Sequence, residues 1–471
     1  MRAQILFLVM VFGKSGAESQ GPVKRLLHRY QESRSPPDFR PLHDHLGNPS
    51  YHGSSYRLTH TSSPRYFAPK PAVPRNEIAQ KLQEARKVIM AGNKFGLNLM
   101  RFLISENDNT IMAPVSLSIA LGMLYFAAAG NTKAELSRAL HYDDFGEDPN
   151  NLLTPIRFLN EAAKASKAQG VTVELGNLIF AQKNLNISKD YRALIEETFG
   201  GFVEDIDFSQ TVQAVTQMNK IITSLTKGQI DNPIESVSPT TRVVLTNAVF
   251  FKGFWKKPFS VRSSFDSTFF NDGVSEVPVK MMYMRDSFLV KSLPELDADA
   301  IQLPYESDIT IMLVLLPRNP NGVNRMLQNL NIAKVIEDLP TYANESVDLH
   351  IPRFSVRGSY HLKKQLYDLG IKDLFVRGKA DLPQLDTEGQ LVVDDVLHEA
   401  KIRVDERGTE AVAISTAAII NYSRYPSFNV RHPFVFFVIH KETGSIFFAG
   451  KILRMNSQEQ APTSGGKTQG R

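Results

Sequence analysis

The sequence contains no cysteine among its 471 residues. Disulfide bonds, thiolate zinc sites and a cysteine nucleophile are therefore excluded. A chain of this length has ample material for a large core, so we expect burial of apolar side chains to provide its stability. Tryptophan is also scarce, since Trp255 is the single one.

Long apolar runs and a strong charge imbalance are lacking as well. Beyond the N-terminal run Ile5–Phe12, no run approaches the ~20 apolar residues that a membrane helix needs. Arg2 before that run and small residues up to Ala17 predict a signal peptide over residues 1–17, and hence a secreted, extracellular protein. The net charge of +5 is small, so we expect no nucleic acid as a partner, and the lack of further long apolar runs predicts no membrane partner.

Catalytic motifs are a further absence. No G-x-S-x-G, H-E-x-x-H or G-x-G-x-x-G pattern occurs in the chain. His398 lies in the strand-like run VVDDVLHEAKIRV, where a lone histidine is more often a hydrogen-bonded core residue than a catalyst. We therefore expect no enzyme activity, no cofactor and no metal site.

The two ends of the chain differ from its middle. Residues 18–75 are rich in Pro, Ser, Tyr, His and Arg, with nine Lys/Arg against four Asp/Glu, which predicts a disordered basic extension. This extension is either an arm that binds a polyanion such as heparin or a solvated tail. Residues 456–471 are polar and predict a disordered tail, which leaves 76–455 as the folded domain.

Apolar periodicity predicts helices early in this domain and strands later. The predicted helices cover Asn76–Ile104, Ser116–Phe126 and a stripe at Leu362, Leu366 and Leu369. The predicted strands cover Val171–Leu175, Val243–Phe251, Ile309–Leu316 and Val347–Ile351. Because strands and helices do not alternate regularly, the pattern favours an α+β fold.

The most informative segment lies within residues 404–433. From Thr409 onward every second residue is small or short until Ile419, whereas bulkier residues fill many of the alternate positions. Side chains alternate faces along a strand, so this segment could slide between two strands with its thin face inward. The alternative is an ordinary edge strand with a small-residue face.

A polar stretch and a predicted hairpin follow. NYSRYPSFNV, starting at Asn421, contains a proline and reads as an exposed tip. Pro433–His440 and Ser445–Leu453 are strongly β-forming, and Lys441–Gly444 between them suits a short hairpin loop.

With these segments in order, the chain resembles the serpins over roughly residues 76–455. The matching segments are Asn109-TIMAPVSLSIALGML, Gly130-NTKAEL, Leu245-TNAVFFKGFW, His398-EAKIRVDERGTEA, His432-PFVFF and Phe447-FAGKI. The chain departs from the family pattern at Ala113, Arg407 and Arg431. The resemblance implies a serpin fold, with helices around a large mixed central sheet and an exposed reactive-centre loop.

In serpins this loop is bait for a serine protease, which forms an acyl-enzyme before the loop inserts as an extra strand of the central sheet. The resemblance implies a monomer that traps an extracellular serine protease covalently. It implies a hinge at Glu406, Gly408, Thr409, Glu410, Ala411 and Ala413. It also implies a sheet-opening region at Ser116, Asn247, Trp255 and His398.

The small residues of the hinge favour an inhibitor, because a charged or bulky inward side chain would cost several kcal/mol on insertion. The alternative is a non-inhibitory serpin that carries a ligand or binds a partner.

Counting along the family's loop from Gly408, or back from Pro433, places the reactive bond at Tyr422–Ser423. Tyrosine before the bond implies a chymotrypsin-like target, and Arg424–Tyr425 offers a trypsin-like alternative. A glycan on the sequon at Asn421 would block protease docking, so we expect it to be mostly unoccupied if the chain inhibits a protease. The expected glycosylation sites are the sequons at Asn186 and Asn344.

Overall fold

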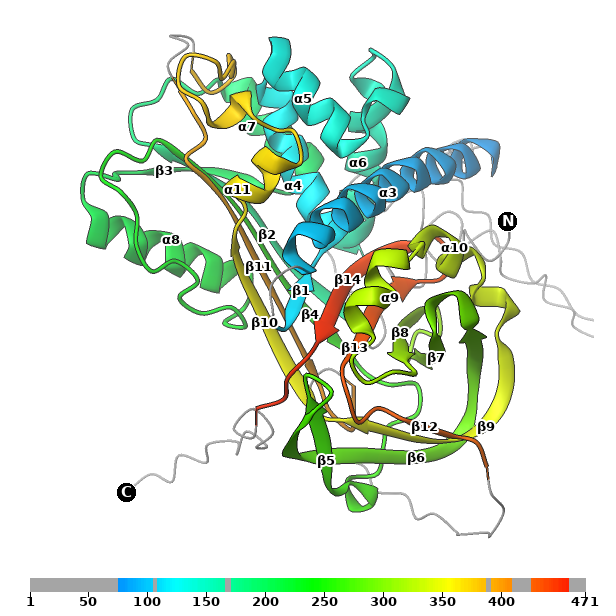
Figure 1. Ribbon diagram of the computed structural model, residues 1–471. Helices are drawn as coiled ribbons and strands as arrows, with labels where there is room; N and C mark the ends of the chain where they lie inside the picture. The colour runs from blue at the N-terminus through cyan, green and yellow to red at the C-terminus, as the bar shows by residue number, and fades with distance from the viewer. Residues whose placement is uncertain (1–74, 105–107, 166–170, 387–390, 409–424, 457–471) are drawn as a thin grey trace, which may run out of the picture.

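The computed structural model describes residues 75–456 except 105–107, 166–170, 387–390 and 409–424. The predicted signal peptide, most of the basic extension and nearly all of the polar tail lie outside the described residues. A five-stranded sheet with the order β10-β11-β4-β2-β3 forms the middle of the molecule (Figure 1). Its strands are β2 (Val171–Gln182), β3 (Phe202–Ile206), β4 (Val243–Gly253), β10 (Phe354–His361) and β11 (Asp395–Val404).

The pairing of β4 with β11 brings two predicted sheet-opening residues, Asn247 and His398, onto neighbouring strands. The two strands run parallel and pair directly, from Val244 opposite Asp395 to Phe251 opposite Ile402. Each has an antiparallel neighbour on its other side, β2 beside β4 and β10 beside β11. The sheet therefore contains a parallel seam between two antiparallel pairs, and the chain leaves β11 beside the end of β4.

A second sheet of nine strands packs against one end of the first. Its order is β1-β14-β13-β8-β7-β6-β9-β12, with β5 paired to β6. The strands are β1 (Thr110–Met112), β5 (Phe265–Asn271), β6 (Ser275–Leu293), β7 (Ala298–Pro304), β8 (Thr310–Pro317), β9 (Ala343–Pro352), β12 (Ser427–Asn429), β13 (Phe434–His440) and β14 (Ser445–Ile452). β13 and β14 form the predicted C-terminal hairpin, and Gly444 in its turn has φ of 73°, a left-handed conformation that glycine adopts at little cost.

Helices cover both faces of the five-stranded sheet. In Figure 1, α8 lies on one face, and the cluster of α3, α4, α5 and α6 lies on the other. The helices are α3 (Arg75–Ile104), α4 (Pro114–Ala127), α5 (Gly130–Leu140), α6 (Asn150–Ala165), α7 (Lys189–Leu194), α8 (Thr211–Leu225), α9 (Val323–Asn329), α10 (Ile332–Glu337) and α11 (Lys363–Asp368). Single turns lie at η1 (Asp143–Phe145), η2 (Ile195–Phe199), η3 (Val261–Ser263), η4 (Pro294–Leu296), η5 (Leu339–Thr341) and η6 (Asp373–Phe375).

The core follows the alternation of side chains along the central strands. On β2, Phe180 packs in a cluster with Met218 of α8, whereas its neighbour Ile179 packs on the opposite side with Leu121 of α4. Toward the far end of β4, Phe251 packs among side chains of the nine-stranded sheet. The central sheet is therefore buried on both faces along most of its length, and a strand added to it would have to present side chains that fit.

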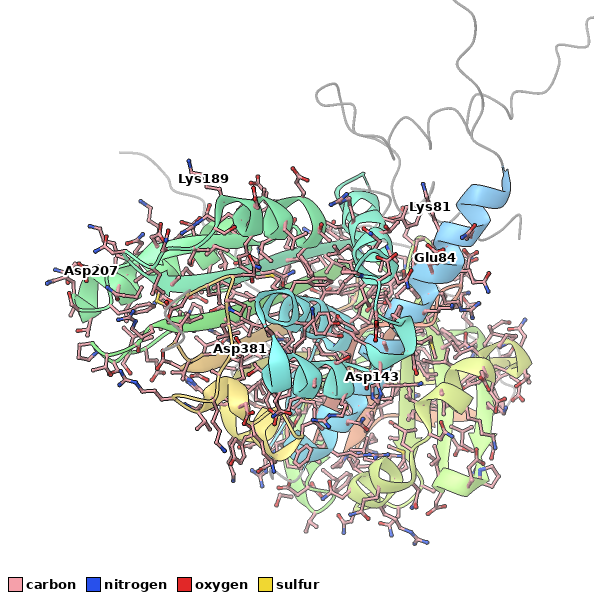
Figure 2. All side chains as sticks on the ribbon, turned by 90° about the horizontal axis from the view of Figure 1, so that it is seen from above. Lys81, Glu84, Asp143, Lys189, Asp207 and Asp381 are labelled. Atoms are coloured by element: carbon pink, nitrogen blue, oxygen red, sulfur yellow. The ribbon has the colours of Figure 1, made fainter. Side chains whose placement is uncertain are left out.

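Charged side chains lie on the outside of the helical layer. Figure 2, seen from above, shows Lys81 on α3, Lys189 at the start of α7 and Asp207 after β3 projecting from the rim. Within the described part of the chain, no three His, Asp or Glu side chains are grouped so that they could hold a metal ion. The same part of the chain contains no helix with the length and apolarity that crossing a membrane requires.

The predicted α+β class is confirmed, with helices concentrated early and strands late. The predicted helix at Asn76–Ile104 is the single helix α3, and the predicted strands at Val243–Phe251 and Ile309–Leu316 are β4 and β8. The strand predicted at Val171–Leu175 is longer than expected and continues to Gln182, because pairing with β4 carries it past the polar residues that interrupt the apolar pattern.

Candidate functional site

Three of the four predicted sheet-opening residues meet in one hydrogen-bonded cluster beneath the β4–β11 seam. Asn247 on β4 lies directly opposite His398 on β11. The amide nitrogen of Asn247 donates to Ser116 Oγ on α4 at 2.8 Å and to Asn177 Oδ1 on β2 at 2.6 Å. Asn247 and His398 are fully buried and Ser116 is half-buried. The cluster thus joins two strands on one side of the seam to a strand on the other and to α4.

The hydrogen bonds of His398 fix its tautomer. Its Nε2 accepts from the backbone N–H of Ala113 at 3.1 Å, so Nδ1 carries the proton and donates to Asn247 Oδ1 at 2.8 Å. The Ala113 backbone makes this contact whatever its side chain, so the departure from the family pattern here leaves the bond intact. Burial lowers the pKa of His398 to about 4, and the ring is neutral at physiological pH.

This buried histidine gives a pH dependence that can be measured. In the unfolded chain, with a histidine pKa near 6.5, the ring binds a proton below about pH 6.5, whereas in the folded state it binds one only below about pH 4. Stability is therefore lost as the pH falls from 6.5 toward 4. Between pH 7 and pH 5 we expect wild type to lose about 2 kcal/mol more unfolding free energy than His398→Gln, measured by urea denaturation.

The His398→Gln comparison cancels the other buried histidines, because both proteins contain them. A second measurement does not require the variant to fold: the His398 ring in wild-type protein should show no NMR titration above pH 5. A titration midpoint near 6.5 would show that the ring is not held neutral by burial.

Trp255 lies apart from this cluster, at the edge where β11 leaves the sheet. It is eight residues beyond Asn247, which is roughly 26 Å along an extended chain. Its indole Nε1 donates to the carbonyl of Asp405 at 2.9 Å, and its backbone N–H donates to the carbonyl of Arg407 at 2.8 Å. Its ring stacks on Tyr305 with centroids 4.6 Å apart. Trp255 therefore contacts the start of the predicted hinge, whereas the other three residues lie under the middle of the seam.

The two predicted hinge residues that the structure describes are both held tightly. Glu406 is 3% exposed, and its carboxylate accepts two 2.7 Å hydrogen bonds from Nε of Arg353 and one from Oγ of Ser264 at 2.5 Å. Gly408 has φ of 135°, and a Cβ there would lie 2.0 Å from the carbonyl oxygen of Gly253. Only glycine fits at this position, so the chain is fixed up to Gly408.

Of the remaining predicted loop residues, only Tyr425 lies within the described part of the chain, and the others lie outside it. These residues are Thr409, Glu410, Ala411, Ala413, Tyr422, Ser423 and Arg424. Tyr425 is described, is 37% exposed and directly precedes Pro426 and β12. The asparagines of the two expected glycosylation sites, Asn186 and Asn344, are both exposed, whereas the sequon at Asn421 lies outside the described residues.

The sequence analysis missed three residues that complete these contacts. Asn177 completes the cluster under the seam, and Arg353 and Ser264 hold Glu406. Each comes from an element distant in the sequence from the residue it contacts. Only strand register and packing bring them together, so no local pattern could have identified them.

Comparison with known proteins agrees with this geometry. A family model described as "Serpin (serine protease inhibitor)" matches residues 90–455. The chain is 32% identical over 368 residues to the leukocyte elastase inhibitor of Xenopus tropicalis, which covers 76% of this chain and 96% of that protein. It is 32% identical over 379 residues to Iripin-2 of Ixodes ricinus, covering 79% of this chain and 95% of that protein.

Among solved structures, mouse protein Z-dependent protease inhibitor is 26% identical, with a TM-score of 0.73 over 80% of this chain and 99% of that chain. The family match covers most of the sequence, and the helices and mixed sheets are arranged as in a solved relative. This chain therefore belongs to the serpin family.

Proposed function

We propose that the protein is a secreted, monomeric serpin that inhibits a serine endopeptidase by covalent trapping and loop insertion. The observation that carries the proposal is the parallel seam between β4 and β11, next to which the chain leaves the sheet at Gly408. A strand that turns back after β11 would run antiparallel to both β11 and β4. Insertion would thus replace one parallel ladder by two antiparallel ones, which are slightly more stable per residue.

The energy of insertion is large enough to drive the mechanism. About a dozen residues that gain ladder hydrogen bonds at ~1 kcal/mol each contribute on the order of ten kcal/mol. This is comparable with the whole stability of a domain. Insertion of ~15 residues at ~3.3 Å each would carry an attached protease tens of ångströms from its docking position.

On this mechanism, some contacts of the site must break when the loop inserts, and others can stay formed. The Asn247–His398 bond spans the seam, so it breaks when β4 and β11 separate. The Arg353–Glu406 ion pair lies between β10 and the end of β11, on the same side of the seam, so it can survive insertion. We propose that Glu406 and Gly408 anchor the hinge and that the inserting segment begins at Thr409.

The bait bond that we propose is Tyr422–Ser423, cut by a chymotrypsin-like protease, with Arg424–Tyr425 as the alternative for a trypsin-like one. The protease serine attacks the carbonyl carbon of Tyr422, the amine of Ser423 leaves, and the acyl-enzyme ester persists because insertion distorts the protease.

We expect the purified protein, mixed with chymotrypsin, to give a band at the summed mass on a denaturing gel. The covalent ester survives denaturation, whereas a docked complex does not. Chymotrypsin with its active-site serine blocked is the control and should give no such band. Complete cleavage of the loop with full protease activity remaining would contradict inhibition and support the non-inhibitory carrier instead.

The location and the accessory segments are also part of the proposal. The family includes both secreted and intracellular members, so family membership does not decide the location. We infer secretion from the signal peptide predicted over residues 1–17. Residues 18–75 are proposed as a basic arm that binds a polyanion such as heparin, because of their excess of Lys and Arg. Asn186 and Asn344 are proposed to carry glycans, since both are exposed.

A further inference from the structure

The segment just after the proposed bait bonds is first held at Asp348 of the nine-stranded sheet. Asp348 on β9 donates its backbone N–H to the carbonyl of Pro426 at 2.9 Å. Ser427 then pairs with Asp348 in the parallel ladder between β12 and β9. The backbone is thus fixed from Pro426 onward, immediately after Tyr425.

The side chain of the same aspartate orients an arginine on the neighbouring strand β6. Arg285 donates from Nε to Asp348 Oδ1 at 2.6 Å and from Nη2 to Oδ2 at 3.0 Å, a bidentate pair. Tyr283 donates its hydroxyl to Oδ1 of the same carboxylate at 2.9 Å. Hydrogen bonding to Arg285 lowers the pKa of Asp348 below its ordinary value, so the pair stays charged at neutral pH.

The oriented guanidinium lies against the ring of Tyr425. Its central carbon is 4.9 Å from the ring centroid, within the range of a cation–π contact. Because the bidentate pair fixes the guanidinium, the ring of Tyr425 has one preferred position on the surface. Asp348 therefore restrains the chain after the bait bonds twice, through its own backbone and through Arg285.

This restraint affects the two candidate bonds differently. A protease takes the residues on both sides of the bond that it cuts into its cleft. For Arg424–Tyr425, the residue directly after the bond is Tyr425 itself, which must leave Arg285 before the cleft can accept it. For Tyr422–Ser423, Tyr425 is three residues after Tyr422, and its ring can remain on Arg285.

We propose that Arg285 is a specificity-determining positioning residue, which holds Tyr425, protects the Arg424–Tyr425 bond and directs target proteases to Tyr422–Ser423. The location of these bonds rests on the proposed function.

The test is the rate of cleavage at each bond in Arg285→Ala, with the new N-termini identified by sequencing. We expect trypsin to cut after Arg424 about two- to fivefold faster in the variant, the factor that loss of one exposed cation–π contact gives. Cleavage by chymotrypsin after Tyr422 should change much less. An unchanged rate after Arg424, or an equal change at both bonds, would overturn the proposal.

Two further comparisons separate positioning from a general loss of stability. The effect of Arg285→Ala should persist in a Tyr425→Phe background, which keeps the ring, and disappear in a Tyr425→Ala background; an effect that survives without the ring counts against the proposal. Lys133→Ala is the matched control, because Lys133 lies 4.9 Å from the ring of Tyr125 in the helical layer, and it should leave both rates unchanged.

The outcome is distinguishable from a failure of the proposed function. If the wild type gives no covalent band with chymotrypsin, inhibition fails, but the ratio of the two cleavage rates is still measured. If the band forms and Arg285→Ala leaves the ratio unchanged, only the role of Arg285 fails.

Discussion

A single cut near residue 422 is expected to raise the thermal unfolding midpoint by about ten degrees or more. Before the cut, β4 and β11 pair directly along eight residues each, and the sheet contains no strand between them. On the proposed mechanism, cutting frees the segment that follows Gly408 to enter this seam. A protein that gains stability when its chain is broken is unusual. A cut normally destabilises a protein, because it increases the conformational entropy of the unfolded chain and of locally unfolded states.

The size of this shift follows from the ladder hydrogen bonds. The unfolding entropy is about 2.1 cal/mol/K per residue, or about 0.8 kcal/mol/K for a domain of this length. Dividing the ~10 kcal/mol that insertion contributes by this entropy gives a rise in the unfolding midpoint of about 12 °C. Differential scanning calorimetry before and after chymotrypsin treatment measures it. A cut confined to residues 18–75 is the matched control, since it leaves both ends of the seam intact. Equal midpoints for intact and cut protein would mean that no energy is stored in the native arrangement.

The sequence predicted elements whose signal is local. The apolar segment after Pro114 became α4 because it is buried on nearly every side, and the terminal hairpin formed where β-rich runs flank Lys441–Gly444. The predicted strand Val171–Leu175 ends before Asn177, because Gly176 and Asn177 interrupt the apolar pattern, whereas β2 continues to Gln182. Tertiary pairing with β4 outweighs this local signal.

The candidate site was predictable only as separate pieces. The family motifs identified Ser116, Asn247 and His398, and the register of β4 against β11 brings them together. Motifs could not show that Trp255 lies at the end of the sheet, away from the cluster around Asn247. The two residues are separated because β4 is extended between them. Register is set by pairing over the whole strand and cannot be read from spacing.

The contacts that hold the two ends of the loop had no sequence signal at all. Arg353 reaches Glu406 across 53 positions of sequence, and Arg285 reaches Asp348 across 63. An isolated arginine or aspartate in a strand normally indicates a solvated face. Their importance comes from the sheet order, which places β10 beside β11 and β6 beside β9.

Thr409→Arg is expected to convert the inhibitor into a substrate. On the proposed mechanism Thr409 is the first residue to enter the seam, on the same face as the small residues Ala411 and Ala413. At the end of the seam where the chain enters, Phe251 and Ile402 are fully buried on one face, so an arginine on that face would be desolvated without a partner. An unpaired charge in such a place costs several kcal/mol, which slows insertion by about a hundredfold or more. The protease then completes hydrolysis before it is trapped.

Glu410→Arg is the matched control for this prediction, because the next residue along a strand points to the opposite face. On the opposite face, Lys252 and Lys401 are only partly buried, which leaves room for a charged side chain to reach water. We expect Thr409→Arg to be cleaved at the bait bond with almost no covalent band, and Glu410→Arg to retain most of its covalent complex on the same gel. Calorimetry adds a second readout: cleaved Thr409→Arg should lack most of the rise in midpoint that cleaved wild type shows. Equal trapping by Thr409→Arg and wild type, or equal loss in both variants, would mean that the face of the entering residue does not decide insertion. In that case the alternation of small residues from Thr409 to Ile419 would have no role in inhibition.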